Sequence, residues 1–114
     1  MVNGRSTATF ADASGAPIAA LSCDRAQRRV LLSRSGAGAT TLPMVVTTTS
    51  TRRPLSGDAS YAPSGWLVVP IPATDSLLDA IAFSRGRFAL EAAGQETLYL
   101  PSWPEISRVV EDCR

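Results

Sequence analysis

The sequence predicts an α+β fold that is mainly β: an antiparallel sheet or small sandwich of about seven strands, with two short helices in the C-terminal half. Three observations lead to this prediction. Short segments rich in apolar and β-branched residues alternate with turn residues along most of the chain. The connectors between the early segments are too short for a helical crossover, which favours antiparallel pairing. Apolar residues recur clearly at helical spacing in two late segments.

Each predicted strand combines apolar or β-branched residues with turn signals at its ends. The seven segments are 6–12, 18–23, 29–33, 41–51, 66–71, 87–92 and 96–100. The first two segments and the last two are expected to form hairpins, because only a short Gly-containing turn separates the members of each pair.

The later half of segment 41–51 is polar on both faces, which indicates a strand at the edge of the sheet. Arg52 and Arg53 followed by Pro54 would oppose further pairing at that edge. The polar stretch could also pair with its counterpart in a second copy across a two-fold axis, which would give a homodimer. The candidates for this edge-strand interface are Thr47, Thr49, Thr51 and Arg53.

The two helices are predicted from capping residues and from apolar spacing. Ser76 is a favourable N-cap for the first helix, with Asp79 at the spacing of a capping box. The second helix is expected over 103–111 with Ser102 as its N-cap. Its apolar stripe, which should pack on the sheet, consists of Ile106, Val109, Val110 and Cys113.

The chain length of 114 residues suits one domain. Residues 5–114 are expected to form this single β-rich domain, and residues 1–4 to be a disordered tail or a remnant added for expression. No apolar run approaches the ~18 residues of a membrane helix, so no membrane span is expected.

Groups that commonly carry catalysis are scarce. The chain has no histidine and no lysine, and all 11 basic residues are arginine. One chain therefore cannot build a Ser-His-Asp triad, a His-containing zinc site, a P-loop or a Schiff base. We expect no enzyme, no metal and no cofactor. A carboxylate-based hydrolase is the less favoured alternative, because Asp75 and Asp79 lie one helical turn apart, a spacing that helix capping explains more simply.

The formal net charge of +1 argues against nucleic acid as a partner. The arginines nevertheless cluster at two turns. Charged groups in solvated loops are the simpler interpretation, and the alternative is contact with an anion or a partner through forked guanidinium groups. The candidates for such contact, with one aromatic residue expected to be partly exposed, are Arg25, Arg28, Arg29, Arg85, Arg87 and Trp103.

Cys23 and Cys113 are expected to form a disulfide. A penultimate cysteine is a poor core residue, because chain ends fray unless they are tied down. The alternative is a pair of inert free thiols. A disulfide indicates an oxidising compartment. We therefore expect a periplasmic or secreted protein whose signal peptide has been removed.

The closing stretch, Leu98–Ile106 through Glu111–Arg114, together with Ser22-Cys23-Asp24, resembles small exported proteins of Gram-negative bacteria, and the nearest named family is invasion-associated locus B. The resemblance implies an exported location and a non-enzymatic role, and it transfers no catalytic residues. We expect a periplasmic or cell-envelope domain that binds a protein or an envelope component. The alternative is a carrier of a small ligand or anion that uses an arginine and the aromatic residues Tyr61, Trp66, Tyr99 and Trp103.

Overall fold

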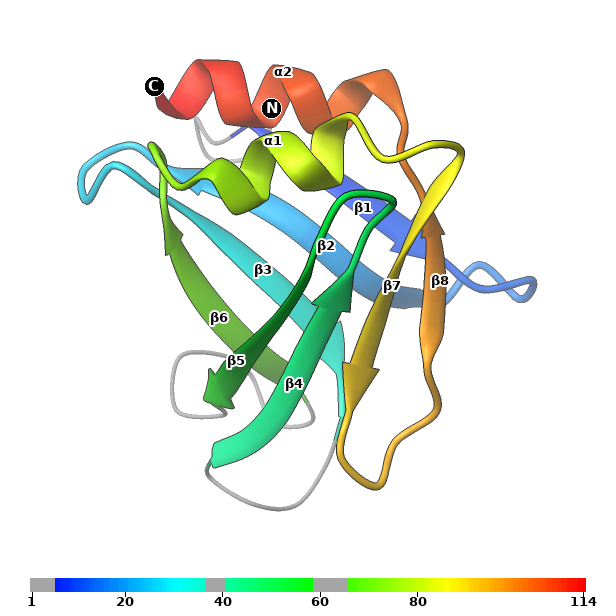
Figure 1. Ribbon diagram of the computed structural model, residues 1–114. Helices are drawn as coiled ribbons and strands as arrows, with labels where there is room; N and C mark the ends of the chain where they lie inside the picture. The colour runs from blue at the N-terminus through cyan, green and yellow to red at the C-terminus, as the bar shows by residue number, and fades with distance from the viewer. Residues whose placement is uncertain (1–5, 37–40, 59–65) are drawn as a thin grey trace.

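The computed structural model describes residues 6–36, 41–58 and 66–114 (Figure 1). The predicted tail at 1–4 and Tyr61 lie outside the described residues. The described chain is mainly β and confirms the predicted fold class. Its elements are β1 (Thr7–Ala11), β2 (Pro17–Asp24), β3 (Arg29–Ser35), β4 (Thr41–Thr47), β5 (Arg52–Asp58), β6 (Trp66–Pro72), α1 (Ser76–Ala82), β7 (Arg87–Ala92), β8 (Leu98–Pro101) and α2 (Pro104–Cys113).

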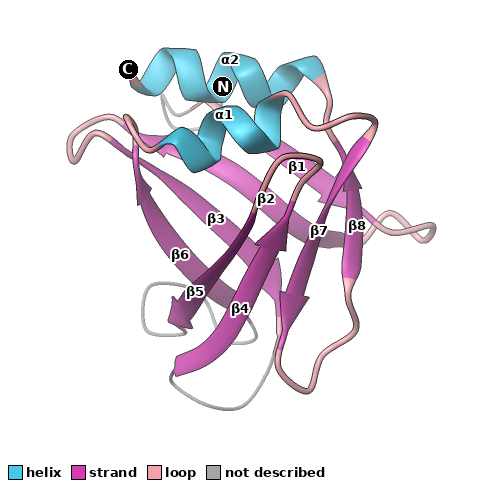
Figure 2. Cartoon of the chain, viewed as in Figure 1, coloured by secondary structure: helices cyan, strands magenta, loops and turns pink. Residues whose placement is uncertain are grey.

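The eight strands form one antiparallel sheet in the order β1-β2-β3-β6-β5-β4-β7-β8. Strands β4, β5 and β6 follow one another as a meander, and β7 returns through α1 to lie beside β4. This arrangement is a Greek key. The sheet curls into a nearly barrel-like body, and both helices lie across one end of it (Figure 2).

The core shows how far the sheet curls. Phe10 of β1 and Phe88 of β7 come from opposite ends of the strand order, yet their rings meet edge to face with centroids 6.2 Å apart. Both helices bury an apolar face against this core, as the spacing of their apolar residues predicts. The buried residues are Leu77, Leu78 and Ile81 in α1, and Ile106, Val109, Val110 and Cys113 in α2.

The predicted strand 41–51 is wrong in its second half, because β4 ends at Thr47. The Thr48 hydroxyl accepts hydrogen bonds from the backbone N–H groups of Ser50 and Thr51, at 3.2 and 3.1 Å. These local bonds close a turn and compete with continuation of the ladder. The structure places β4 between β5 and β7, so the prediction that Thr47, Thr49, Thr51 and Arg53 form one sheet edge is also wrong.

Strand β5 was not predicted from the sequence, because its residues RRPLSGD are typical of turns. Among these residues, Gly57 is required for packing rather than for a turn. A Cβ added at Gly57 would collide with the side chain of Met44, and it would lie 3.3 Å from Cβ of Leu67. Glycine at this position therefore allows β5 to approach the core closely.

Strands β5 and β6 separate along most of their length. Among the described residues, Asp58 with Val68 is the one pairing between them. Prolines interrupt the positions that follow. The pairs that would continue the ladder in this register are Ser56 with Pro70 and Pro54 with Pro72.

The direction of the neighbouring hydrogen bonds explains this gap. The Ala73 N–H donates to the Arg28 carbonyl next to β3, at 3.0 Å. Because backbone groups alternate in direction along a strand, Pro70 and Pro72 direct their nitrogens toward β5 instead. A proline nitrogen carries no proton, so the ladder cannot extend across the gap.

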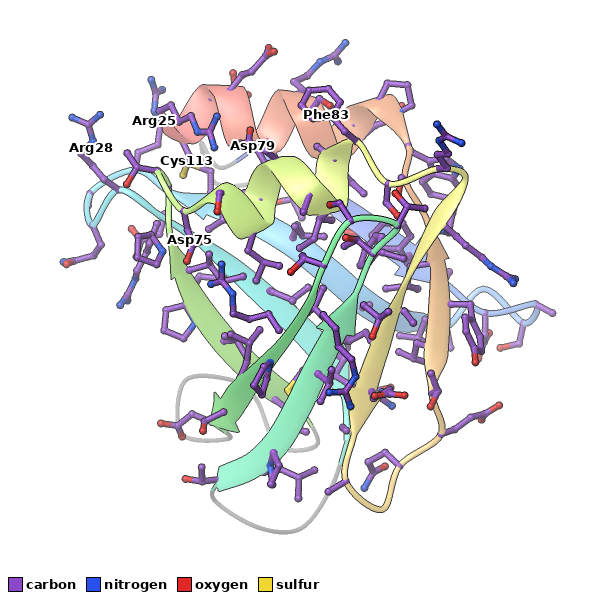
Figure 3. All side chains as sticks on the ribbon, viewed as in Figure 1. Arg25, Arg28, Asp75, Asp79, Phe83 and Cys113 are labelled. Carbon is purple, nitrogen blue, oxygen red and sulfur yellow. A yellow bond between two sulfur atoms is a disulfide. The ribbon has the colours of Figure 1, made fainter. Side chains whose placement is uncertain are left out.

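The structure corrects the N-cap of α1 from Ser76 to Asp75 (Figure 3). The Leu77 N–H donates to Oδ1 of Asp75 at 2.9 Å. Arg53 binds the same carboxylate through two hydrogen bonds, at 3.0 and 3.1 Å, and so holds it at the start of the helix. This ion pair spans the gap between β5 and the end of β6.

The predicted cap of α2 is also wrong. Trp103 is the N-cap residue, and it makes no side-chain capping bond. The Ser102 N–H donates to the Gly86 carbonyl at 3.1 Å, which extends the contact between β7 and β8 by one residue. Ser102 thereby belongs to the sheet, and its buried hydroxyl finds no partner among the described residues.

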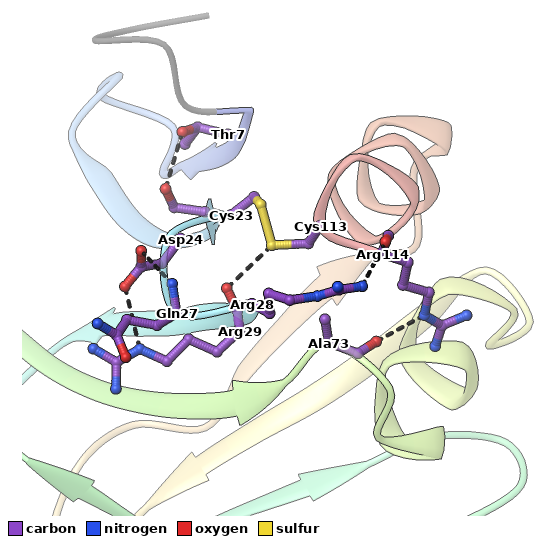
Figure 4. Close-up of a disulfide and its surroundings, with 10 residues drawn as sticks. Thr7, Cys23, Asp24, Gln27, Arg28, Arg29, Ala73, Cys113 and Arg114 are labelled. Carbon is purple, nitrogen blue, oxygen red and sulfur yellow. Dashed lines mark hydrogen bonds and ion pairs between the residues drawn. A yellow bond between two sulfur atoms is a disulfide. The ribbon is translucent and has the colours of Figure 1, made fainter.

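A disulfide joins Cys23 of β2 to Cys113 at the end of α2, with an S–S distance of 2.07 Å, as predicted (Figure 4). Both residues are buried. Next to the disulfide, Nη2 of Arg28 donates to the Arg114 carbonyl at 3.0 Å. The end of α2 is thus attached to the sheet by one covalent bond and one hydrogen bond.

Arg114 continues this attachment toward α1. Its Nε donates to the Ala73 carbonyl at 2.7 Å, and its two terminal nitrogens bind the Asp79 carboxylate at 2.9 and 3.0 Å. The last residue of the chain therefore holds the two helices together over the end of the barrel.

Replacing both cysteines by alanine should lower the free energy of unfolding by roughly 4–5 kcal/mol, because the disulfide limits the entropy of the unfolded chain over a separation of 90 residues. Urea unfolding followed by circular dichroism measures the change. Reduction of the wild-type protein should give a similar loss. The comparison variant is Arg114→Gln, which removes the exposed ion pair with Asp79 and the hydrogen bond to the Ala73 carbonyl and should cost about 2 kcal/mol or less. If the double cysteine variant and Arg114→Gln lowered the free energy of unfolding equally, the disulfide would not be the main stabilising contact at the end of α2.

Candidate functional site

The structure places the first arginine cluster at the turn between β2 and β3 and uses most of it structurally. Nε of Arg29 donates to the Asp24 carboxylate at 3.2 Å. Arg28 has a left-handed backbone (φ 52°) and holds the Arg114 carbonyl. Arg25 points into solvent beside the end of α2 (Figure 3). The contacts of Arg28 and Arg29 therefore mainly stabilise the turn between β2 and β3 next to the disulfide.

The second cluster lies at the other end of the helices. The hydrogen bond from Ser102 to Gly86 brings the Arg85–Arg87 turn beside the start of α2. The Arg87 guanidinium lies 5.0 Å from the centre of the Tyr99 ring, a cation–π contact. The residue after Ser102, Trp103, is the N-cap of α2, so the Arg85–Arg87 turn and Trp103 both lie at the start of α2. The first cluster lies at the other end of this helix, where Arg28 contacts Arg114.

Trp103 lies where the two outer strands of the curled sheet, β1 and β8, do not pair with each other. Its indole stacks on Phe10 of β1 at 5.2 Å, yet 46% of the residue is exposed. Strands β1 and β8 are the outer strands of the sheet, and in the described chain neither pairs on its outer side. We call the groove beside β1 the seam groove. It measures about 470 Å³ and is lined by Thr7, Ala8, Thr9, Trp103, Pro104 and Glu105.

The free edge of β1 borders the seam groove. The Cys23 N–H donates to the Ser6 carbonyl at 2.9 Å, so Ser6 faces β2. By alternation, the N–H and C=O groups of Thr7 and Thr9 face away from β2. No backbone hydrogen bond to these groups occurs among the described residues.

Three of the four predicted interface residues line a second groove, between the β4–β5 turn and α1. It measures about 450 Å³ and includes Thr49, Thr51 and Arg53. Phe83 at the end of α1, a residue that is 75% exposed, borders it. Thr47 is not among its lining residues. One of its lining residues, Arg53, is already paired with Asp75, which is not among the lining residues.

The two carboxylates that could suggest a hydrolase are each bound by an arginine. Arg53 lowers the pKa of Asp75, and the Leu77 N–H lowers it further, while burial opposes the change. A general acid in a glycosidase needs a raised pKa. Asp79 is held by Arg114 through both carboxylate oxygens.

Arg34 is the charged residue that the sequence reasoning missed. It follows Val30 and Leu32 on the inward face of β3, and it is only 2% exposed. This alternation was a usable signal, but the predicted strand stopped at Ser33. Nε of Arg34 donates to the Ser35 carbonyl at 2.9 Å, and Nη1 donates to the Leu90 carbonyl at 3.0 Å. Burial lowers the pKa of Arg34, and the charge of Glu96 partly opposes this effect.

Arg34 forms the inner wall of a third hollow, which we call the Arg34 cavity. It measures about 510 Å³ and is lined by Asp12, Ile18, Arg34, Ser35, Gly36, Gln95, Glu96 and Leu98. Its residues come from the β1–β2 turn, the end of β3 and the β7–β8 turn. It is separate from the seam groove, with which it shares no residue.

In the part of the chain that the structure describes, no three His, Cys, Asp or Glu side chains gather to hold a metal ion. None of the described helices has the length and apolar character needed to cross a membrane. Comparisons with protein-family models, with curated proteins and with solved structures find no match.

Substitutions at Asp75 separate its capping role from its ion pair. Asp75→Asn keeps an oxygen at the N-cap and loses the charge, and Asp75→Ala loses both. At neutral pH we expect Asp75→Ala to lower the free energy of unfolding by about 1–2 kcal/mol and Asp75→Asn to lower it less. Because the folded-state pKa of Asp75 is lowered, its ionised form stabilises the fold above its unfolded-state pKa.

That stabilisation disappears as the pH falls through the folded-state pKa. The difference between the wild-type protein and Asp75→Asn should therefore shrink in acid. Urea unfolding at a series of pH values measures it. A difference that stays constant from neutral pH into strong acid would contradict the role of the ion pair.

Proposed function

We propose that this chain is a non-enzymatic binding domain of an oxidising compartment, periplasmic or secreted. It binds an extended segment of a partner protein along the free edge of β1, beside Trp103. The observation that carries this proposal is the direction of the Thr7 and Thr9 backbone groups, which face away from β2 on the strand that borders the seam groove. A row of unpaired N–H and C=O groups is the surface to which an added strand binds.

The two sheet edges differ in how well they resist pairing. Strand β8 has only four residues and ends in Pro101, and both features oppose pairing. Strand β1 contains neither proline nor a charged residue. Its register shifts between Phe10 and Ala11, so the regular edge comprises Thr7–Phe10. This length suits a short extended segment.

Side chains around the groove suit the same occupant. Tryptophan, tyrosine and arginine are the residue types that contribute most to protein interfaces. Trp103 presents part of its indole to the groove, and the Arg87–Tyr99 pair lies on the neighbouring surface of β7 and β8. We expect the bound segment to place an apolar side chain against Trp103.

The disulfide supports the location in this proposal, because cytosolic thiols are usually kept reduced. The resemblance of Leu98–Ile106 to invasion-associated locus B proteins points to the same location. Titration of thiols under denaturing conditions, on protein isolated from its native source, tests it. Two reactive thiols would count against export.

The non-enzymatic role is supported by the bonding of the two carboxylates. Arg53 and Arg114 each occupy both oxygens of their partner, Asp75 and Asp79. The absence of histidine and lysine from the sequence removes the usual bases.

The backbone of Thr9 allows a sharp test of strand addition. Thr9→Pro removes the outward N–H, and the matched control Thr9→Val keeps this group and the β-branched shape. Peptides are selected against the wild-type protein from a random phage-displayed library, and their binding is measured by fluorescence anisotropy. We expect Thr9→Pro to weaken binding by about 1–2 kcal/mol or more and Thr9→Val to leave it nearly unchanged. Amide hydrogen exchange should show new protection at Thr7 and Thr9 in the complex.

Peptides that bind Thr9→Pro as tightly as Thr9→Val would overturn the proposal. Light scattering gives the mass of the protein alone. A dimer that Thr9→Pro converts to monomer would show that a second copy occupies the edge, which also overturns it.

A further inference from the structure

The Arg34 cavity contains a buried positive charge to which no carboxylate of the described residues is bound. We propose that it binds a small zwitterion, an α-amino acid, whose carboxylate contacts Arg34 and whose ammonium group contacts Glu96. This inference is independent of strand addition at β1, because the two hollows share no residue.

Burial of a guanidinium ion is costly unless an anion or hydrogen-bond acceptors compensate it. Arg34 has two backbone carbonyls as acceptors, on Nε and Nη1. Among the described residues, none accepts a hydrogen bond from Nη2, and no carboxylate lies within ion-pair distance of Arg34. A guanidinium has five N–H donors in a flat fork, so donors remain for a ligand carboxylate.

Two carboxylates on the wall of the cavity oppose a simple anion. Glu96 is exposed, and its charge reaches Arg34. Asp12 is exposed as well, and its Oδ1 accepts hydrogen bonds from the N–H and hydroxyl of Ser14 and from the Ala16 N–H, at 2.6 to 3.1 Å. These bonds, the one from the Ser14 hydroxyl most of all, lower the pKa of Asp12. A ligand therefore meets one positive group inside and two negative groups outside.

A zwitterion matches this order of charges. Its carboxylate would lie inside on Arg34 and its ammonium group outside near Glu96. Ile18 and Leu98 supply apolar wall for the side chain of the ligand. Gly36 contributes no side chain, and a Cβ there would lie 2.8 Å from Leu67 Cδ1, so the structure favours glycine at this point of the wall. An amino acid with an aliphatic side chain fits these surfaces best.

Titration of the full chain with three related probes tests the assignment of charges. Leucine carries both charged groups, isocaproate lacks the ammonium group and isoamylamine lacks the carboxylate. We expect saturable binding of leucine by isothermal calorimetry or by amide chemical shifts around the cavity. Each of the other two probes should bind at least about tenfold more weakly, because each loses one charge-assisted contact.

Variants locate the two contacts. Glu96→Gln changes an exposed residue and should weaken leucine binding about tenfold without weakening the binding of isocaproate. The matched control is Glu105→Gln, an exposed residue in the first turn of α2 outside the cavity, which should change neither affinity. Arg34→Gln should abolish binding of both probes, with circular dichroism as the check on folding.

The Glu96 variant and the three probes test the proposed binding of a zwitterion even if the Arg34 variant does not fold. Isocaproate that binds the wild-type protein as tightly as leucine would overturn the contact with Glu96 and leave a simple anion site. No saturable binding of leucine would overturn the proposal and leave Arg34 a structural residue.

Discussion

The attachment of α2 to β2 keeps this helix over the open end of the sheet. The sheet curls without closing, so one end of the barrel and the line between β1 and β8 need cover from outside the sheet. Helix α2 provides both, because its apolar stripe lies on the core and Trp103 at its start stacks on Phe10. The disulfide of Cys113 holds the far end of this helix on β2.

In the part of the chain that the structure describes, the sheet lacks pairing along most of β5 and β6 and between β1 and β8, and the residues at these two places differ. Between β5 and β6 the prolines remove donors, and the Arg53–Asp75 ion pair crosses the gap. Pairing with another strand is therefore opposed there by the backbone itself. The described outer edge of β1 has neither proline nor a charged residue, and Trp103 lines the same groove as Thr7 and Thr9, whose outward backbone groups have no backbone partner among the described residues. This contrast is why we assign binding to β1 rather than to the polar stretch around Thr49.

Arg34 raises a different physical question. An inward-facing position at the end of an apolar strand face would ordinarily hold an aliphatic residue, and here it holds a charge with only carbonyl partners among the described residues. Carbonyl oxygens satisfy hydrogen bonds but supply no opposite charge. A cavity with Glu96 on its wall is a place where that charge can be compensated by a ligand, without a new covalent or metal group.

Much of the local structure could be predicted from the residues alone. Alternation predicted most strands, apolar spacing predicted the buried faces of α1 and α2, and the position of Cys113 predicted its disulfide. That RRPLSGD is a strand, that β4 is interior, and that Arg34 is buried beside a cavity became clear from the folded chain. This division arises because periodicity reports which side of an element faces the core. The choice of neighbouring strands, and the hollows between them, depend on contacts between residues far apart in the chain.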